Sequence, residues 1–351
     1  MEQETRSPAL LTPEEIEPAA GLAGQVLDEL DRLLLGQSSL HRMVLIGVLS
    51  RGHILFEGLP GVGKTALIKA LADILNLSFS RVQFTPDLMP GDIVGTSILQ
   101  ENEQGKREMV FERGPVFTNI LLADEINRAS PKTQSALLEA MQEQRVTTLG
   151  ATRELPSPFF VLASQNPIEL EGTYPLPEAQ VDRFLFKLRV SGVKAEVLEQ
   201  IVDTRRRGEP PGVRWRLPAG GMDVLTRAME RIVLPRPVAR YVARLVAATH
   251  PDNAGAGEGV TRYVSYGASP RAAIAMAEAG RAAALLSGRP TVGFEDIKAV
   301  APAVLNHRIL LNYQARFDKV DSFDVVEQLL AAVNDVGLDL PEDLAVEVRA
   351  T

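Results

Sequence analysis

The chain has 351 residues, of which 45% are hydrophobic and 23% are charged. This composition predicts a globular protein with one large or two ordinary domains, because chains of this length can bury substantial cores. The formal net charge of -8 disfavours nucleic acid as a default partner, and the absence of cysteine excludes disulfides, zinc–thiolate sites and cysteine nucleophiles.

The N-terminal segment MEQETRSPALLTPEEIEP is acidic and lacks the basic and apolar regions of a signal peptide. No later apolar run reaches about 18 residues before Glu or Arg interrupts it, so the sequence predicts no membrane-spanning helix and a cytoplasmic protein. We expect residues 1–20 to form a flexible tail. A helix should follow over AAGLAGQVLDELDRLLLGQ and end at Gly36.

Short β-rich runs then alternate with helical patterns such as KTALIKALADIL and PKTQSALLEAMQEQ. This alternation predicts an α/β domain over residues 21–190, with a parallel five-stranded sheet between two layers of helices. Such sheets bind ligands at the carboxyl ends of their strands. The expected strands are HILFEG (53–58), LSFSRVQF (77–84), NILLADE (119–125), FFVLASQN (159–166) and FLFKLRV (184–190).

Two segments interrupt the alternation and have the pattern of β-hairpins. Residues 92–114 suggest two extended arms around a polar turn, and residues 145–156 suggest a shorter hairpin around Gly150. The alternative is that both segments are ordinary edge strands of the main sheet.

The stretch EGLPGVGKTAL, residues 57–67, fits the phosphate-loop pattern G-x-x-x-x-G-K-[ST] and follows an expected strand. The glycines allow backbone N–H groups to point at phosphates, Lys64 can reach the outer phosphates, and the Thr65 hydroxyl can ligate magnesium. The alternative is a glycine-rich turn without a ligand. The residues expected to bind the nucleotide are Gly58, Leu59, Pro60, Gly61, Val62, Gly63, Lys64, Thr65 and Ala66.

The run NILLADE ends in two adjacent acids at the ligand-binding edge of the predicted sheet. We expect Asp124 to hold magnesium and Glu125 to deprotonate the attacking water, so that ATP and Mg²⁺ are the cofactors. A solvated turn is the alternative. Arg128 lies just beyond these acids, and the sequence does not distinguish catalysis from subunit contact for it.

Four longer strings resemble the MoxR family of AAA+ ATPases, and the similarity extends over roughly residues 30 to 310. The strings are QFTPDLMPGDIVG, GPVFTNILLADEINRASPKTQSALLEAMQE, ASQNPIELEGTYPLPEAQVDRFLF and GASPRAA. The resemblance implies that both hairpins are insertions, one in the helix after the second strand and one before the fourth. In such ATPases they face the centre of a ring or the client.

The resemblance also implies roles for three further residues. Asn166 matches the sensor 1 residue, which helps to position water, although it could simply cap a strand. Arg183 matches the arginine finger that acts on a neighbouring subunit, although it could form a structural ion pair with Asp182 or Glu178. Arg271 matches sensor 2, although it could be a surface arginine at a helix start.

The second half of the chain has helical patterns separated by loops rich in proline and glycine. Residues 191–351 are therefore expected to form a helical lid domain that ends in a further amphipathic helix and an acidic tail of unassigned function. Arginines at 205–207 near Trp215 could contact nucleic acid, but the end of a solvated helix is the more common explanation for such a cluster.

Taken with the resemblance, the sequence predicts an ATP hydrolase that works as a ring of about six subunits. The ring would remodel or mature protein complexes, metal cofactor insertion included, with a protein client and a partner containing a von Willebrand factor A domain. The alternatives are a DNA-directed AAA+ motor and a magnesium-chelatase-like subunit, which share the catalytic core. The nucleotide base is expected near Leu35, Gly36 and Gln37, and the sequence does not show which base is preferred.

Overall fold

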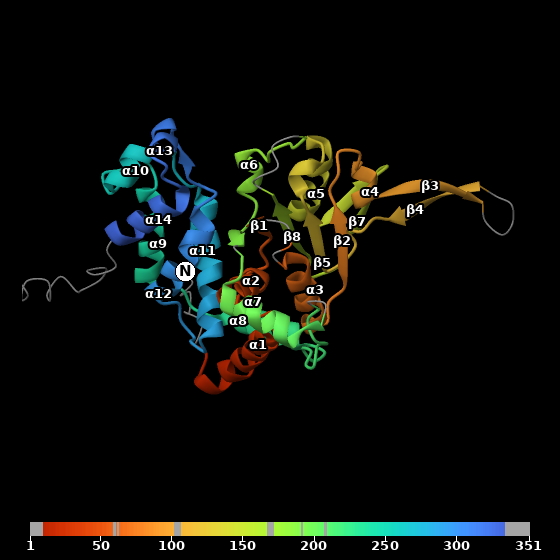
Figure 1. Ribbon diagram of the computed structural model, residues 1–351, viewed down its shortest axis with the longest axis horizontal. Coiled ribbons are helices and arrows are strands. Elements are labelled where there is room, and N and C mark those ends of the chain that lie inside the picture. Colours follow the sequence, from red (N-terminus) through yellow and green to blue (C-terminus); the bar gives the residue numbers. More distant parts are fainter. Residues whose placement is uncertain are drawn as a thin grey trace, which may run out of the picture. The chain divides into compact units, whose positions relative to one another are not determined.

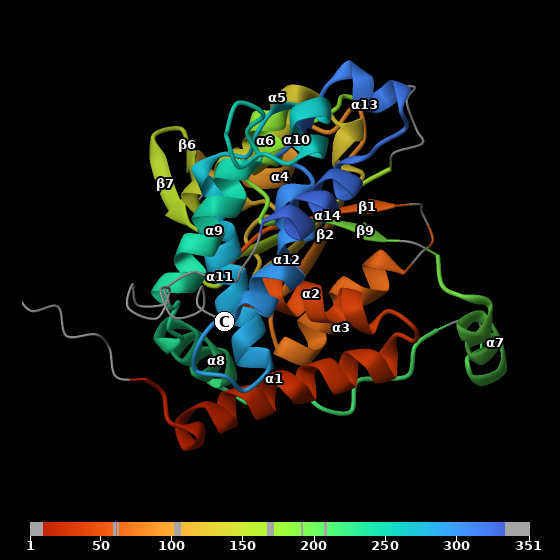
Figure 2. The same cartoon turned by 90° about the vertical axis from the view of Figure 1, so that its left-hand side faces the viewer.

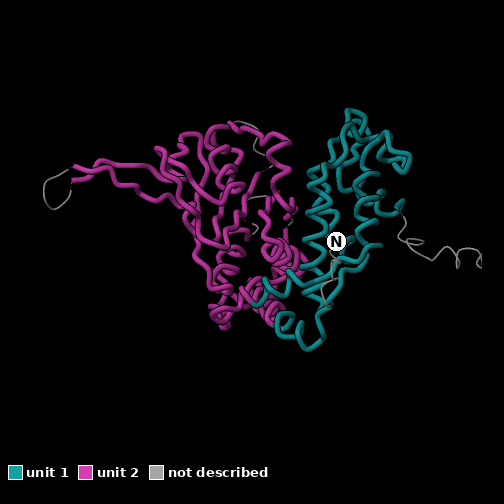
Figure 3. Tube along the Cα trace, turned by 180° about the vertical axis from the view of Figure 1, so that it is seen from behind, with its two compact units in different colours: residues 1–21, 224–351 teal, residues 22–223 magenta. Residues whose placement is uncertain are grey.

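The structure is a computed structural model that describes residues 10–333, except 59, 60, 62, 102–106, 167–171, 191, 207 and 208. The chain forms two compact units (Figure 3). We call residues 22–223, magenta in Figure 3, the first unit, and residues 1–21 together with 224–351, teal in Figure 3, the second unit. The expected boundary at residue 190 therefore differs from the observed one after Asp223.

The first unit contains the expected five-stranded sheet, and all its paired strands are parallel (Figure 1). The strands lie in the order β2-β5-β8-β1-β9, so the strand that precedes the phosphate loop lies between β8 and the edge strand β9. The predicted α/β class is confirmed. The strands are β1 (Ile54–Gly58), β2 (Phe79–Gln83), β5 (Ile120–Asp124), β8 (Phe160–Gln165) and β9 (Phe186–Val190).

Helices cover both faces of this sheet, which explains why its central strands are almost continuously apolar. On one face, Leu55, Leu121 and Val161 share a buried cluster with residues of α5 (Pro131–Glu143) and α4 (Pro90–Val94). On the other face, α3 (Lys64–Leu75) packs against β5, and α2 (Ser38–Leu49) packs against β9.

Both interrupting segments form hairpins, and neither joins the five-stranded sheet. Strands β3 (Gly95–Glu101) and β4 (Arg107–Arg113) pair along their full length and project away from the sheet (Figure 1). Strands β6 (Arg145–Thr148) and β7 (Ala151–Glu154) join through two residues, Leu149 and Gly150, that both have positive φ. Such a two-residue turn matches the twist of a hairpin.

The two hairpins touch each other through aromatic contacts. The Arg153 guanidinium of β7 lies 3.8 Å from the centre of the Phe111 ring of β4. Phe111 in turn lies edge-on to Phe117, with ring centroids 5.9 Å apart. A cation over a ring face is an attractive arrangement, so the hairpins are linked as well as adjacent.

The segment after α7 (Ala195–Thr204) stays with the sheet because α1 (Pro13–Leu33) binds it. The buried Glu29 carboxylate accepts from the backbone N–H groups of Arg214 and Trp215 at 2.6 and 3.4 Å. Arg32 donates to the Gly212 carbonyl at 2.7 Å. The Arg32 guanidinium and these N–H groups lower the pKa of Glu29 to about 2. These hydrogen bonds hold residues 212–215 against α1, which explains why the boundary between the units lies after Asp223 and not at residue 190.

Helix α1 also corrects the expected N-terminal tail. It begins at Pro13, so residues 13–20 are helical and the predicted tail over 1–20 is wrong for them. Pro13 starts the helix, acids occupy its first turn, and Leu11, Ile16 and Ala19 are buried. The many acidic residues at the start of α1 made the spacing of its apolar residues hard to recognise in the sequence. Residues 1–9 lie outside the described part of the chain.

The second unit is mainly helical, as expected, with one short ladder between β10 (Val264–Tyr266) and β11 (Leu310–Leu311). Its central helices α9, α11 and α12 pack together (Figure 2). The helices of this part are α8 (Gly221–Arg231), α9 (Arg236–Ala248), α10 (Glu258–Tyr263), α11 (Pro270–Leu286), α12 (Phe294–Leu305), α13 (Tyr313–Phe317) and α14 (Ser322–Ala332). Beyond residue 333, the expected C-terminal helix and tail lie outside the described residues.

Within the described ranges, none of the helices combines the length and the apolar character that crossing a membrane requires.

A buried histidine makes the stability of the first unit depend on pH. His53 Nδ1 accepts from the Val161 N–H at 2.9 Å, which leaves Nε2 to donate to the Met141 carbonyl at 3.2 Å. Burial lowers the pKa of His53 from 6.5 to about 4. The unfolded chain therefore binds a proton at a higher pH than the native chain does, and stability is lost as the pH falls.

We expect the unfolding free energy of the wild-type protein to decrease as the pH falls from about 6.5 to about 4. His53→Gln should remove the part of this decrease that comes from protonation of His53. Urea unfolding of both proteins across this range measures the effect. Carboxyl groups titrate there too, so the decisive quantity is the difference between the two proteins. A difference that does not change with pH would contradict the assignment.

Candidate active site

The loop after β1 has the backbone that its glycines predict. A Cβ at Gly58 would lie 2.4 Å from the Val190 carbonyl oxygen, so only glycine fits there without a shift of the backbone. Gly61 and Gly63 have φ values of 82° and 90°, in the left-handed region. Of the expected loop residues, Leu59, Pro60 and Val62 lie outside the described residues.

Lys64 is the first residue of α3 and folds back over the loop. Its Nζ donates to the Gly58 carbonyl at 2.9 Å. Partial burial lowers the pKa of Lys64, while the negative charges of Asp124 and Glu125 raise it. The fold therefore brings this cation within electrostatic reach of both acids at the end of β5.

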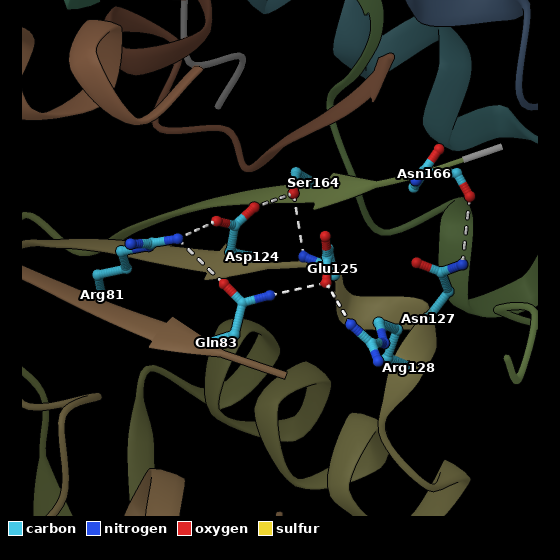
Figure 4. A network of polar contacts seen from close by, with 8 residues as sticks. All are labelled: Arg81, Gln83, Asp124, Glu125, Asn127, Arg128, Ser164 and Asn166. Atoms are coloured by element: carbon cyan, nitrogen blue, oxygen red, sulfur yellow. Dashed lines mark hydrogen bonds and ion pairs between the residues drawn. The ribbon is translucent and has the colours of Figure 1, made fainter. Parts of the chain in front are cut away.

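Asp124 is the last residue of β5 and accepts hydrogen bonds at both carboxylate oxygens (Figure 4). Ser164 Oγ donates to Oδ1 at 2.5 Å, and Arg81 Nη2 donates to Oδ2 at 2.7 Å. Only 15% of the Asp124 side chain is exposed. The predicted alternative, an acid in a solvated turn, does not describe this carboxylate.

Glu125 follows in the left-handed conformation, with φ 55° and ψ 50°. A residue with a Cβ is strained there by about 1 kcal/mol or more, and surrounding contacts must hold it. Its N–H donates to Ser164 Oγ at 3.0 Å. Its Oε2 accepts from Gln83 Nε2 at 2.8 Å and from Arg128 Nη1 at 3.1 Å (Figure 4). The short helix η1 (Ile126–Arg128) starts directly after it.

These groups line one cavity of about 410 Å³. The cavity brings together most of the residues that the sequence singled out and adds two from β2. Its lining residues are Gly61, Gly63, Lys64, Thr65, Ala66, Arg81, Gln83, Asp124, Glu125 and Asn166.

Asn166 reaches the cavity from the residue directly after β8. Its backbone carbonyl faces Asn127 of η1, whose Nδ2 lies 3.5 Å away (Figure 4). Gln134 of α5 supports this turn, because its buried Nε2 donates to the carbonyls of Ile126, Ala129 and Tyr174. The turn after β5 is thereby tied to the start of α5.

Two of the four residues predicted to be catalytic do not line this cavity. Arg183 follows α6 (Glu178–Val181), donates from Nη1 to the Leu138 carbonyl at 3.0 Å, and lines a different cavity of about 500 Å³. Arg271 belongs to the other unit, in the first turn of α11.

A second, mostly apolar cavity of about 440 Å³ adjoins the phosphate loop, because Gly61 and Gly63 line both cavities. Leu35 and Gln37, two of the three residues expected near the base, line it, whereas Gly36 does not. Arg205 of the arginine cluster also lines this cavity, and burial lowers its pKa. This arginine is therefore not at a fully solvated helix end.

The donor set of the first cavity suits magnesium. Thr65 and Asp124 supply a hydroxyl and a carboxylate, which are the hard oxygen donors that this ion prefers. In the part of the chain that the structure describes, no cluster of three or more His, Cys, Asp or Glu could hold a metal. A site with few protein ligands fits an ion that is bound largely through substrate phosphates and water.

The sequence motifs did not point to Arg81, Gln83 or Ser164. The spacing of Arg81 and Gln83 could have indicated that they act together, because residues two apart on a strand point to the same face. Gln83 lies beside Asp124 in the register of β2 and β5, so this face leads to the acids. Ser164 is fully buried next to the end of β8 and interrupts an apolar run.

Comparisons with known proteins agree with this geometry. Residues 53–186 match the family model described as the ATPase family associated with various cellular activities (AAA), and residues 258–329 match the AAA lid domain. A crystal structure of a candidate ATPase from Cytophaga hutchinsonii superposes with a TM-score of 0.81 at 39% identity, covering 92% of this chain and 97% of that one.

Three similar proteins show to which family of AAA+ ATPases the chain belongs. The chain is 44% identical to chaperone MoxR1 of Mycobacterium tuberculosis, over 90% of this chain and 84% of that protein. It is 39% identical to YeaC of Bacillus subtilis, over 89% and 94%. It is 32% identical to MoxR of Methylorubrum extorquens, over 81% and 86%. The chain belongs to the MoxR family of AAA+ ATPases, as its sequence motifs predicted.

Proposed function

We propose that this chain binds ATP with Mg²⁺ in the cavity of about 410 Å³ and hydrolyses the terminal phosphate anhydride bond. The observation that supports this most is the convergence of Lys64, Thr65, Asp124, Glu125 and Asn166 on that one cavity. A phosphate loop and a pair of acids at adjacent strand ends form the arrangement that phosphoryl transfer requires.

The loop and the start of α3 bind the phosphates. Backbone N–H groups around Gly61 and Gly63 and the positive end of the α3 dipole attract the anion, and the Lys64 ammonium faces its outer phosphates. Thr65 and Asp124 hold magnesium, which when bound neutralises phosphate charge. The apolar cavity beside Leu35 and Gln37 receives the adenine base.

Glu125 acts as the general base. Its Oε2 accepts from Gln83 and Arg128, so we assign acceptance of the proton from the attacking water to Oε1. Asn166 orients that water from the end of β8. Ser164 fixes both acids, because its hydroxyl donates to Asp124 and accepts from the Glu125 N–H.

The working form is a ring of six subunits. Arg183 lines a different cavity from the one that contains Lys64, which supports its action on the nucleotide of a neighbouring subunit. Arg271, in the first turn of α11, is assigned the sensor 2 role that the family resemblance implies. Turnover then depends on assembly.

The ring remodels or matures protein complexes in the cytoplasm, and metal cofactor insertion is one form this could take. The name of the M. tuberculosis relative, a chaperone, supports this assignment. So do the hairpins, because Leu99, Met109 and Leu149 are exposed on them and their charged residues are of both signs. Such surfaces suit a protein client better than a nucleic acid. A partner with a von Willebrand factor A domain stays a prediction from the family.

The first test is Glu125→Gln. The amide cannot take a proton, so we expect turnover to fall about 100-fold or more while ATP affinity stays near that of the wild type. Steady-state ATPase assays and equilibrium binding of a fluorescent nucleotide measure the two quantities. Turnover equal to that of the wild type would show that Glu125 is not the general base.

The same variant can test the client, because it should hold ATP without releasing what it binds. Tagged Glu125→Gln, recovered from its native cells with ATP present, should retain a specific protein that Lys64→Ala does not retain. Co-purified nucleic acid in place of a specific protein would favour a DNA-directed motor instead.

A mixing experiment tests the shared site. Arg183→Ala should bind nucleotide but turn over about 10³-fold more slowly or worse, and Lys64→Ala should not bind it. In mixed rings, an intact Arg183 can face an intact Lys64, so the mixture should be more active than either variant alone. Additive activities at every mixing ratio would argue against an arginine supplied by a neighbour.

Ser164→Ala tests whether the buried hydroxyl positions the acids. Its loss leaves Asp124 and the Glu125 N–H each without one partner, so we expect turnover to fall about 10- to 100-fold. Ser50→Ala is the control, because that hydroxyl donates to the Ile46 carbonyl at the C-terminal end of α2. Equal turnover in both variants, with equal thermal unfolding, would contradict a positioning role for Ser164.

A further inference from the structure

Arg81 is a cation inside the nucleotide cavity that the phosphate-loop pattern does not predict. Its Nη2 donates to Asp124 Oδ2 at 2.7 Å and to Gln83 Oε1 at 3.0 Å (Figure 4). The nitrogen carries two hydrogens, so it can make both bonds at once. The Arg81 guanidinium therefore contacts both Asp124, the acid assigned to magnesium, and the Gln83 amide, which contacts the general base Glu125.

The contact to Gln83 determines which end of its amide faces Glu125. With Oε1 accepting from Arg81, the Nε2 group points to Glu125 Oε2 and donates at 2.8 Å. Rotation of the amide by half a turn would place an acceptor against a carboxylate, which is unfavourable. The orientation of Glu125 thus depends on Arg81 through one intervening side chain.

The contact to Asp124 places Arg81 where it competes with a metal ion. Ser164 already donates to Asp124 Oδ1, so the guanidinium takes the other carboxylate oxygen. A divalent cation held by the same carboxylate would repel the guanidinium, because like charges this close together repel even where the arginine is partly exposed. The ion pair and the cation compete for one acid.

We propose that Arg81 is a positioning residue that competes with the magnesium ion for Asp124 and, through Gln83, links loading of that ion to the orientation of Glu125. This inference rests on the proposed function of the site. Loading of a divalent ion at Asp124 would break the Arg81–Asp124 pair and leave Arg81 in contact with the Gln83 amide alone. Through that amide, Arg81 would keep Glu125 Oε2 engaged and leave Oε1 for the attacking water.

Arg81→Ala in the full chain tests the proposal by two separate readouts. The first is the magnesium concentration that gives half-maximal binding of a fluorescent, non-hydrolysable ATP analogue. Without its competitor, Asp124 should bind the ion more readily, so this concentration should fall about fivefold, as expected for a partly exposed ion pair. The second is kcat at saturating magnesium, which should fall because Gln83 no longer has a fixed amide orientation.

Three companion variants separate the possible causes. Gln83→Ala should lower kcat without changing the magnesium dependence. Arg81→Lys keeps the positive charge and should restore the magnesium dependence of the wild type, with partial recovery of kcat. Arg262→Ala removes a matched ion pair of the second unit, at 2.8 Å with a similarly exposed arginine, and should change neither readout.

Each alternative outcome decides against the proposal. An unchanged magnesium dependence in Arg81→Ala would overturn the competition for Asp124. A higher magnesium or nucleotide requirement would also overturn it, because it would mean that Arg81 binds the phosphates directly. If the wild-type chain bound no nucleotide at any magnesium concentration, the proposed function itself would fall, and this inference with it.

Discussion

The register of the parallel sheet is the constraint on which the site depends. Gln83 of β2 lies opposite Asp124 of β5, and Ala163 of β8 lies opposite Ala123, so Ser164 comes next to Asp124. Because the strands are parallel, their carboxyl ends reach the same edge, and each contributes polar groups there. A shift of one residue in any strand would turn these side chains to the other face, where they would be buried among apolar neighbours.

This constraint explains what the sequence could and could not predict. The phosphate loop and the acids of β5 were recognisable because each motif is local and follows an apolar strand. The contacts of Arg81 and Gln83 with the acids were not, because they join residues more than 40 positions apart and depend on which strand lies beside β5. The boundary between the compact units depends on a contact of the same kind, because Glu29 and Arg214 are 185 positions apart.

The same strand end connects the acids to both hairpins. Helix α5 starts just after the turn that contains Arg128, and it runs directly into β6 through Gln144. At its first turn, Thr133 Oγ1 donates to the Leu88 carbonyl at 2.7 Å, in the segment that leads through α4 to β3. The Arg153–Phe111 contact then joins the hairpins to each other. A displacement of α5 would therefore move both hairpins together.

The charges of the cavity indicate how a bound nucleotide would change the hydrogen bonds and ion pairs around it. Arg81 is paired with Asp124 and Arg128 with Glu125, so two of the nearby cations are engaged by the two acids that chemistry would use. A polyphosphate with a metal ion would bring both signs of charge, so it would compete for the acids and for the arginines at once. The strained backbone of Glu125 is held only by the contacts around it, among them those of Ser164, Gln83 and Arg128. A ligand in the cavity that replaced these contacts of Glu125 would therefore alter the turn before α5. Through α5, the change would reach the hairpins.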